Sequence, residues 1–373
     1  MNQKSIRIVA DAHIWCAKEA FSEFEGYQTT LQTLENKDIK PESIRDVDIL
    51  LTRSSTKVNQ VLLDGSQVRF AATATIGDDH YDKAYLERQG ITFASAAGSS
   101  TESVIEYMIA VLEQLKKLGK LSYEADTLGI IGVGRIGGLL EKVCADIGLE
   151  VELNDPPRQQ SEQHRKFREL EYLLKYADVL TLHTPLIKEG EFHTHHLIGS
   201  SELDQFKGKG IINAARGACL DNTALLNWLN DDDSRFAVLD CWEGEPNINL
   251  DLLNHPQVVI ATPHIAGHSL DGKAANTYFI YKHLCDYLQV KPAWNPEEYL
   301  PEIDAKALPS GFSETILVSA LYPITNDHNA MREAGKNEDT FSQWFQDYRR
   351  HYPIRRSWKK SLAQSEYDED LFY

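Results

Sequence analysis

Short apolar runs alternate with amphipathic stretches over the first hundred residues. Four runs are typical of buried strands: Arg7 to Ala10, Val47 to Leu51, Val68 to Thr73 and Ile91 to Ala94. Apolar residues at helical spacing lie between them, as in Lys83 to Gln89. Strands that alternate with helices predict a parallel sheet covered by helices on both faces.

The same alternation resumes after a long helical pattern, Thr101 to Leu118. The further strands that it predicts are Leu128 to Val133, Glu150 to Asn154, Val179 to Leu182, Gly210 to Asn213, Phe236 to Leu239 and Val258 to Ile260. Helical patterns at Leu170 to Tyr176 and Asn222 to Leu229 separate some of them. We therefore expect a second doubly wound α/β sheet.

A last helical pattern, Gly272 to Val290, could return the chain to the first domain, and residues 291–309 are rich in proline and acid. The pattern predicts three domains. The first is discontinuous and comprises residues 1–102 and 266–290; the second comprises residues 103–265, and the third residues 291–373.

Composition excludes several partners. The formal net charge of -18 at pH 7 repels nucleic acid and anionic membranes, so neither is expected. No apolar run approaches the roughly twenty residues that cross a bilayer, and the start resembles no signal peptide, which predicts a cytoplasmic protein.

The scattered cysteines indicate reduced thiols and neither disulfides nor a zinc site: Cys16, Cys144, Cys219, Cys241 and Cys285.

A glycine motif follows the first predicted strand of the second domain. Gly132, Gly134 and Gly137 have the spacing G-x-G-x-x-G, and a helical pattern comes directly after them. The first glycine permits a tight turn, the second lets a pyrophosphate approach the backbone, and the third lets helix and strand pack closely. The helix N-terminus then points free N–H groups at the phosphates. The motif predicts a dinucleotide site.

An acid at the end of the next strand refines this prediction. Asp155 lies about twenty residues after the glycines, where a carboxylate can accept the ribose hydroxyls. Its charge repels a 2′-phosphate, so NAD is the expected cofactor. Arg158 is close enough to keep NADP open as an alternative.

Three loops after strands of this domain carry further polar side chains. They contribute Arg216, then Asp240, Glu243 and Glu245 in LDCWEGEP, then His264 in TPHIAGH. Ligands of open α/β sheets bind at this edge. Arginine holds carboxylates through paired hydrogen bonds, and histidine accepts protons near neutral pH. Each residue alone could be structural, but an arginine, an acid and a histidine after strands of one domain predict a catalytic site.

The second domain also contains a histidine-rich segment, HTHH, from His193 to His196. Its spacing lacks the acid partners of a helical zinc motif, so no metal site is expected.

The motifs resemble those of the D-isomer-specific 2-hydroxyacid dehydrogenases. The segments that carry the resemblance are LLTRSSTKVN, ATATIGDDHYD, GIIGVGRIGG, NDPPR, LTLHTPL, INAARGACLDNTALL, LDCWEGEP and TPHIAGHSLDGKA. The resemblance implies a flavodoxin-like substrate domain and a Rossmann NAD domain. The segment from LYPITND to RRSW resembles an extra α+β dimerisation domain found in one branch of the family, which implies a homodimer.

The resemblance also implies roles for individual residues. Arg216 would bind the substrate carboxylate and carbonyl, His264 would be the acid/base, and Glu245 would support His264. Residues expected at the cofactor are Gly132, Gly134, Arg135, Ile136, Gly137, Asp155, Thr184, Ala214, Ala215, Asp240 and Gly267. Residues expected at a small anionic substrate are Arg53, Ser54, Thr75 and His268.

Departures from the family pattern leave the exact 2-hydroxy acid open. They border the expected substrate cleft and are Ile76, Asp78, Ala97, Ser100 and His268. The resemblance makes a phosphorylated four-carbon acid the main expectation, with Arg53, Arg349, Arg350, Arg355 and Arg356 as candidate phosphate ligands. The alternatives are phosphoglycerate, glyoxylate or hydroxypyruvate as the substrate, and an NAD-sensing interaction protein related to corepressors.

Overall fold

The computed structural model describes residues 3–162, 166–303 and 314–363, and its backbone contacts divide the chain into two compact units. Unit 1 comprises residues 1–102, 269–302 and 354–357, and unit 2 comprises residues 103–268, 303–353 and 358–373. The chain passes between the units close to the N-terminal ends of α4 (Thr101–Lys117) and α11 (Leu270–Leu288).

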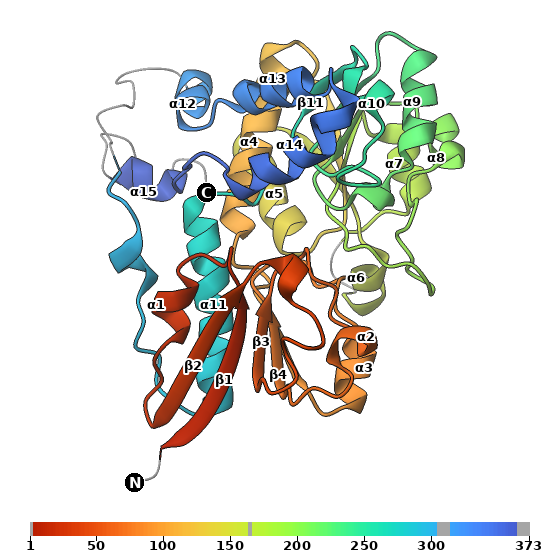
Figure 1. Ribbon diagram of the computed structural model, residues 1–373. Helices are drawn as coiled ribbons and strands as arrows, with labels where there is room; N and C mark the ends of the chain where they lie inside the picture. Colours follow the sequence, from red (N-terminus) through yellow and green to blue (C-terminus); the bar gives the residue numbers. More distant parts are fainter. Residues whose placement is uncertain (1–2, 163–165, 304–313, 364–373) are drawn as a thin grey trace. The chain divides into compact units, whose positions relative to one another are not determined.

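Unit 1 contains a five-stranded parallel sheet with the order β2-β1-β3-β4-β5 (Figure 1). Its strands are β1 (Lys4–Asp11), β2 (Tyr27–Leu34), β3 (Ile49–Thr52), β4 (Phe70–Thr73) and β5 (Thr92–Ser95). Its other helices are α1 (Ala17–Phe21), α2 (Gln60–Leu63) and α3 (Lys83–Arg88). This strand order is that of flavodoxin-like folds, as predicted.

Alternate residues of the central strands in unit 1 serve two apolar layers. Ile8 and Ile49 belong to the cluster that includes α1 and α11, whereas Val9 and Leu50 belong to the cluster with α2 and α3. Because both faces are covered, these strands are continuously apolar in sequence.

Strand β2 is absent from the sequence prediction. Its sequence YQTTLQTL alternates partly exposed and exposed positions, and it pairs with β1 alone at one edge of the sheet. An edge strand with one wet face has no continuous apolar run, which explains why the hydrophobic pattern did not reveal it.

Unit 2 contains a six-stranded parallel sheet with the order β11-β10-β9-β8-β6-β7. Its strands are β6 (Thr127–Ile131), β7 (Glu150–Asn154), β8 (Val179–Leu182), β9 (Gly210–Asn213), β10 (Phe236–Leu239) and β11 (Val258–Ala261). Its helices up to α10 are α5 (Arg135–Asp146), α6 (Pro156–Ser161), α7 (Leu170–Tyr176), α8 (Ser200–Gln205), α9 (Asn222–Asn230) and α10 (Leu250–Asn254). The sequence therefore predicted all six strands.

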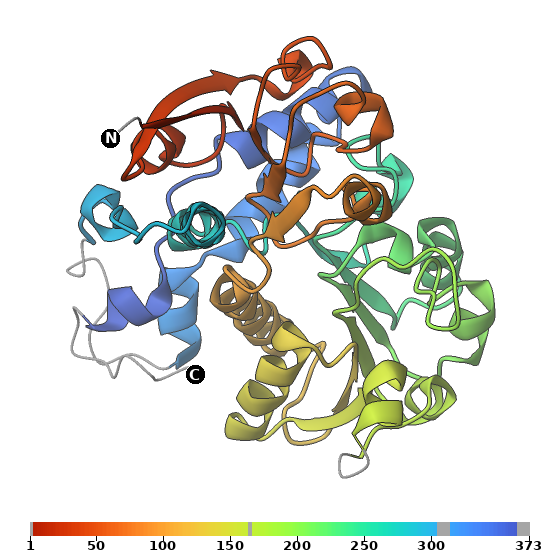
Figure 2. The same cartoon turned by 90° about the horizontal axis from the view of Figure 1, so that it is seen from below.

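Helices cover both faces of this sheet (Figure 2). Ile130, Ile212 and Val238 belong to the apolar cluster with α4 and α5, whereas Ile211 and Leu239 belong to the cluster with α7 to α10. The order of the strands reverses direction at β6, whose two neighbours are β7 and β8. Ligands of doubly wound sheets bind at such a switch point.

Within residues 314–363, all the regular secondary structure of the C-terminal segment is helical. It forms α12 (Glu314–Leu321), α13 (Ile324–Ala334), α14 (Glu338–Arg350) and α15 (Trp358–Ala363). The predicted α+β character of this segment is thus corrected for residues 314–363, where helices are joined by loops and no strand is present. The apolar positions recur at helical spacing, and Phe341 and Phe345 are buried one turn apart on α14.

These C-terminal helices pack on unit 2 and share its core. Met331 and Phe345 join the cluster on one face of the sheet, and Leu317 joins the cluster on the other. Arg332 donates from Nη2 to the carbonyl oxygens of His255 (2.6 Å) and Val258 (2.8 Å) beside β11. Within the described ranges, no helix has the length and apolar composition to span a bilayer.

Candidate active site

The glycine turn between β6 and α5 is packed against the turn after β8. Gly132 has φ +87°, and a Cβ there would lie 2.8 Å from the backbone nitrogen of Thr184. A Cβ on Gly137 would lie 2.2 Å from the carbonyl oxygen of Gly132. A Cβ on Gly134, by contrast, would meet nothing within 4 Å. Packing therefore requires glycine at positions 132 and 137. Gly134 instead leaves open space at the N-terminus of α5, where an anion fits.

Asp155 is held beside this turn. Its Oδ2 accepts a hydrogen bond from the Val133 N–H (2.8 Å), and its Oδ1 accepts one from the Arg158 N–H (3.1 Å) at the start of α6. The guanidinium of Arg158 also donates to the Val133 carbonyl and pairs with both carboxylate oxygens of Glu162. A fixed carboxylate next to a glycine turn at the switch point fits NAD, since the carboxylate oxygens can accept ribose hydroxyls.

The remaining residues expected at the cofactor come from the same edge of the sheet. Arg135 and Ile136 begin α5, and Thr184 follows β8. Ala214 and Ala215 follow β9, where the Asn213 side chain accepts a hydrogen bond from the Ala215 N–H (3.1 Å). Gly267 lies in the loop after β11. Their contacts with a cofactor remain predictions.

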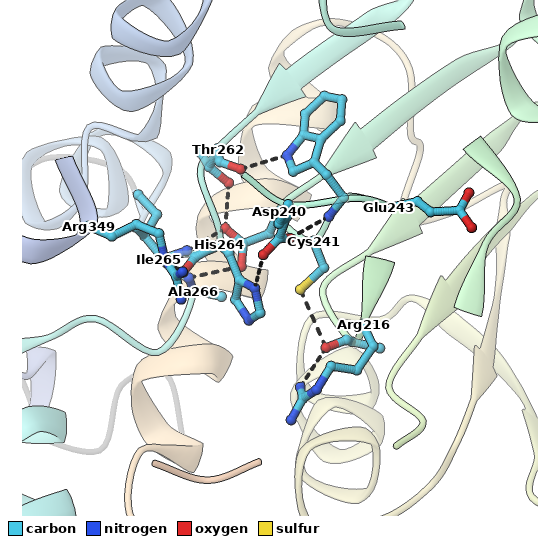
Figure 3. A network of polar contacts seen from close by, with 12 residues as sticks. Arg216, Asp240, Cys241, Glu243, Thr262, His264, Ile265, Ala266 and Arg349 are labelled. Carbon is cyan, nitrogen blue, oxygen red and sulfur yellow. Dashed lines mark hydrogen bonds and ion pairs between the residues drawn. The ribbon is translucent and has the colours of Figure 1, made fainter. Parts of the chain in front are cut away.

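A buried carboxylate organises the loop that carries the candidate base (Figure 3). Asp240, directly after β10, accepts hydrogen bonds from Thr262 Oγ1 (2.7 Å) and from the N–H groups of Ile265 (2.8 Å) and Ala266 (3.0 Å). Burial raises the pKa of Asp240, while these donors and the nearby charge of His264 oppose the rise. Asp240 therefore acts as a positioning residue for the loop after β11.

His264 stands in this loop in a strained backbone conformation. Its φ is 55°, in the left-handed region that is uncommon for residues other than glycine. Its N–H donates to the carbonyl oxygens of Asp240 (2.7 Å) and Thr262 (3.0 Å), which hold the turn. Strain of this kind persists where the surroundings over-determine the conformation, and it is concentrated at functional sites.

Glu245 is the acid that reaches His264. The Oε2 of Glu245 lies 2.8 Å from Nδ1 of His264, and its Oε1 accepts a hydrogen bond from the Trp242 N–H (2.6 Å). Burial alone would raise the pKa of Glu245, but the charge and hydrogen bond of His264, aided by the charge of Arg349, lower it overall. Figure 3 shows the carboxylate of Glu243, the other acid of this loop, directed away from His264.

Arg216 and Cys241 meet at one carbonyl group. Arg216 Nη1 donates to the Ala215 oxygen (2.7 Å), and the Cys241 thiol also donates to it (3.4 Å). Atoms of Cys241, Glu245 and His264 lie within 4.8 Å of one another. Burial raises the pKa of Cys241 well above its usual value, so the thiol stays protonated. The structure thus gathers the arginine, the acid and the histidine of the predicted site around a neutral thiol.

Arg349 of α14 is a further cation at this loop. Its Nε donates to the carbonyl oxygen of His264 (3.3 Å). The sequence suggested Arg349 only as one of several phosphate ligands, because its position 85 residues after His264 carries no local signal. Arg350 pairs with Asp347 (3.3 Å), and the partly buried ion pair of Arg356 with Asp271 (3.0 Å) is internal to unit 1.

Neither His268 nor Arg355 is fully exposed at the surface. The ring of His268 lies edge-on to Tyr352 with centroids 6.0 Å apart. Arg355 is buried in unit 1, and its carbonyl oxygen accepts a hydrogen bond from the Leu270 N–H (2.7 Å) at the start of α11. A substrate contact for His268 remains a prediction.

Unit 1 places its expected substrate residues after adjacent parallel strands. Arg53 and Ser54 follow β3, and Thr75 follows β4. The hydroxyl of Thr75 lies 2.7 Å from that of Thr73 and donates to the Gly77 carbonyl (3.0 Å). The loops after both strands therefore lie at the carboxyl edge of the sheet, where ligands bind.

Lys273 of α11 adds a cation that sequence reasoning did not single out. Its pKa is lowered from 10.5 to about 8, first by burial and then by the charge of Arg53. Two cations that repel one another in a partly buried place favour an anion between them. The lysine stands in the quoted segment TPHIAGHSLDGKA, but only the tertiary structure brings it to Arg53.

Comparison with known proteins supports the class that the site defines. The family model for the D-isomer specific 2-hydroxyacid dehydrogenase, NAD binding domain, matches residues 104–266. A solved D-lactate dehydrogenase from Aquifex aeolicus, complexed with NAD and lactic acid, has a TM-score of 0.64 at 22% identity and covers 76% of this chain and 95% of its own. A 3-phosphoglycerate dehydrogenase from Entamoeba histolytica with bound NAD+ also has a TM-score of 0.64, covering 78% and 99%. These likenesses show the fold.

The chain belongs to the D-isomer-specific 2-hydroxyacid dehydrogenase family. Within it, the similar relatives include the erythronate-4-phosphate dehydrogenase of Proteus mirabilis, which is 37% identical over 359 residues (95% of this chain and 93% of the relative). The erythronate-4-phosphate dehydrogenase of Marinobacter nauticus is 39% identical over 360 residues (94% and 92%).

Proposed function

We propose that this protein oxidises 4-phospho-D-erythronate to 2-oxo-3-hydroxy-4-phosphobutanoate with NAD, as a step of vitamin B6 biosynthesis. The observation that carries the chemistry is the 2.8 Å contact between Glu245 and Nδ1 of His264. The assignment of the substrate is supported by relatives named erythronate-4-phosphate dehydrogenase, which align with the chain over nearly its whole length.

His264 is the general base. Because Nδ1 faces Glu245, Nε2 is the nitrogen that takes the proton of the substrate's 2-hydroxyl. Glu245, whose lowered pKa keeps it ionised near neutral pH, stabilises the imidazolium that forms and fixes the ring. NAD bound at the glycine turn and Asp155 supplies the acceptor for the hydride from C2.

Arg216 binds the substrate carboxylate and the oxygen that becomes a carbonyl. A guanidinium binds a carboxylate through two parallel hydrogen bonds, and its charge stabilises the oxygen that becomes a carbonyl. Its 2.7 Å hydrogen bond to the Ala215 carbonyl orients the side chain from behind. The buried bonds of Asp240 keep the loop of His264 in place during the reaction.

Replacing the base tests the mechanism. We expect His264→Asn, which tolerates the left-handed backbone, to lower kcat by about a hundred- to ten-thousand-fold, while NAD still binds in a fluorescence titration. His193→Asn, at an exposed histidine of the same unit, is the control and should keep normal turnover. A normal rate in His264→Asn would exclude this residue from proton transfer.

The two cations of unit 1 support recognition of the phosphate group. We assign Arg53 and Lys273 to the 4-phosphate, since burial, and then the charge of Arg53, lowers the pKa of Lys273 to about 8. An anion beside the two cations favours the charged form of the lysine. In the substrate-free enzyme, Lys273 is protonated below this pKa, so binding of the phosphorylated acid should weaken as pH rises through about 8.

A substrate comparison tests this assignment. We expect Lys273→Met to lower kcat/KM for 4-phosphoerythronate at least tenfold, with little change for erythronate, and to remove the alkaline loss of affinity. Lys282→Met, at an exposed position of the same helix, is the matched control. Equal efficiency of the wild type on both acids would contradict a phosphate site without touching the role of His264. A panel with phosphoglycerate, glyoxylate and hydroxypyruvate tests the alternative substrates.

We further propose that the protein is a cytoplasmic homodimer that assembles through its C-terminal domain. The proposal is supported by the resemblance of the C-terminal segment to the dimerisation domain of one branch of the family. Sedimentation equilibrium of the full chain should give twice the 42.2 kDa mass of one chain. A concentration-independent monomer would contradict it.

A further inference from the structure

We propose that His195, His196 and Glu243 form a binding site for a divalent transition-metal ion such as Zn²⁺, separate from the catalytic residues. Atoms of these three side chains able to bind a metal lie within 4.8 Å of one another. Two imidazoles and a carboxylate are a donor set that zinc accepts readily, whereas Mg²⁺ and Ca²⁺ prefer oxygen ligands alone. The site does not depend on the proposed substrate.

The fold supplies the acid that the histidine-rich segment lacks locally. His195 and His196 lie between β8 and β9, and Glu243 comes from the loop after β10. Oε1 of Glu243 lies 2.6 Å from Nε2 of His196. The carboxylate of Glu243 points away from His264 (Figure 3), so it is available for a role outside the catalytic centre.

The backbone around these side chains is fixed. His196 has φ 50°, and its N–H donates to the carbonyl oxygen of Ala218 (2.7 Å). Glu243 and Asn222 hold one another: the Glu243 N–H donates to the Asn222 side chain (3.1 Å), and Oε2 of Glu243 accepts from the Asn222 N–H (3.3 Å). The rings of His195 and His196 stack with centroids 4.1 Å apart. Glu243 and His196 are therefore held in place, and the exposed ring of His195 has to turn out of the stack for its nitrogen to reach the same ion.

A second carboxylate lies near the other ring nitrogen of His196. Oδ2 of Asp221, the N-cap residue of α9, lies 3.7 Å from Nδ1 of His196, on the side of the ring opposite to Glu243. Histidines that bind metals nearly always donate a hydrogen bond from their second nitrogen, which orients the ring; Asp221 lies at ion-pair distance and would move slightly closer to accept it. Asp221 would therefore support the metal without binding it.

The geometry leaves room for an ion and for water. With zinc–ligand bonds of about 2.0–2.1 Å, tetrahedral donors stand roughly 3.3 Å apart, so the contact of His196 with Glu243 widens only slightly. Their side chains are 35% and 31% exposed, and His195 is exposed. An ion can thus enter from solvent and keep a water molecule as its fourth ligand.

The test measures zinc bound to the full chain. Because Cys241, Glu245 and His264 also lie close together, all variants are made in the His264→Asn background, which removes a ligand from that second cluster. After equilibration with zinc and desalting, elemental analysis should find one zinc per chain. Adding His196→Asn, Glu243→Gln or His195→Ala should abolish it, and His193→Ala, in the same segment, should retain it.

Two further readouts separate a true site from misfolding. Asp221→Asn keeps the cap of α9 and should weaken zinc binding about 10- to 100-fold, without changing the melting temperature of the zinc-free protein. Co²⁺ bound in place of zinc should show visible d–d bands and no thiolate charge-transfer band. Absence of bound zinc in the parent, zinc retained by His196→Asn or Glu243→Gln, or a thiolate band would each overturn the proposal.

Discussion

At the scale of single residues, burial assigns opposite roles to two histidines at the same edge of the unit 2 sheet. His183 follows β8, is partly buried, and has its pKa lowered from 6.5 to about 4 by burial alone. His264 follows β11 and stands next to the ionised Glu245. A histidine that stays neutral is a structural part, whereas one held by a carboxylate at Nδ1 presents its other ring nitrogen for proton transfer.

This contrast predicts how stability depends on pH. Below pH about 6.5 the unfolded chain protonates His183 and the folded chain does not, so stability is lost as pH falls from there to about 4. The loss reaches about 3 kcal/mol. In urea unfolding followed over this range, His183→Gln should show a flatter dependence on pH than the wild type. His193→Gln is the control, and an unchanged slope in His183→Gln would contradict the argument.

At the scale of elements, the turn from β6 to α5 combines two different demands on glycine. At Gly137 the demand is packing, because the helix touches the Gly132 carbonyl, and at Gly134 it is space for a ligand. Asp155, directly after β7, and the turn after β8 then converge on this point because β6 lies between those two strands.

Three alanine variants separate these demands. Gly137→Ala forces backbone atoms apart and should cost about 1–3 kcal/mol of unfolding free energy, or more. Gly138→Ala, whose Cβ would have its nearest neighbour at 3.9 Å, should be neutral or slightly stabilising. Gly134→Ala should keep the fold but weaken NAD binding. Calorimetric melting and NAD titration measure the two effects; a stable Gly137→Ala would refute the packing role.

At the scale of the whole molecule, the C-terminal helices are part of the NAD-binding unit and not an appendage. Phe345 is fully buried in the same cluster as strand residues of β8 to β11. Asp327 of α13 accepts hydrogen bonds from the hydroxyls of Tyr322 (3.0 Å), Tyr348 (2.6 Å) and Tyr352 (2.8 Å). Through Arg349, this segment also reaches the loop of His264.

Removing one of these side chains should therefore destabilise a sheet far from it in sequence. We expect Phe345→Ala to lower the unfolding free energy of unit 2 by about 3–5 kcal/mol. Gln343→Ala, exposed on the same helix, should have almost no effect. Denaturant unfolding in the presence and absence of NAD measures both. If α14 unfolded separately, ahead of an unaffected Rossmann sheet, the shared core of the C-terminal helices and unit 2 would be contradicted.

The sequence alone determined the two parallel sheets and the glycine turn, and it predicted Arg216, Glu245 and His264 as the candidate catalytic residues. These features depend on local periodicity and on spacings within single βα units, which a linear pattern records. It missed β2, whose half-exposed edge position leaves a weak hydrophobic signal. It also overestimated the β content of the C-terminal segment.

Only the tertiary structure decided which side chains meet. It brought Glu245 to His264 while turning Glu243 toward His196, and it placed Arg349 at the loop of His264 and Lys273 near Arg53. These pairings join residues from different strands and helices. Their distances depend on strand order and packing, which no spacing within one segment encodes.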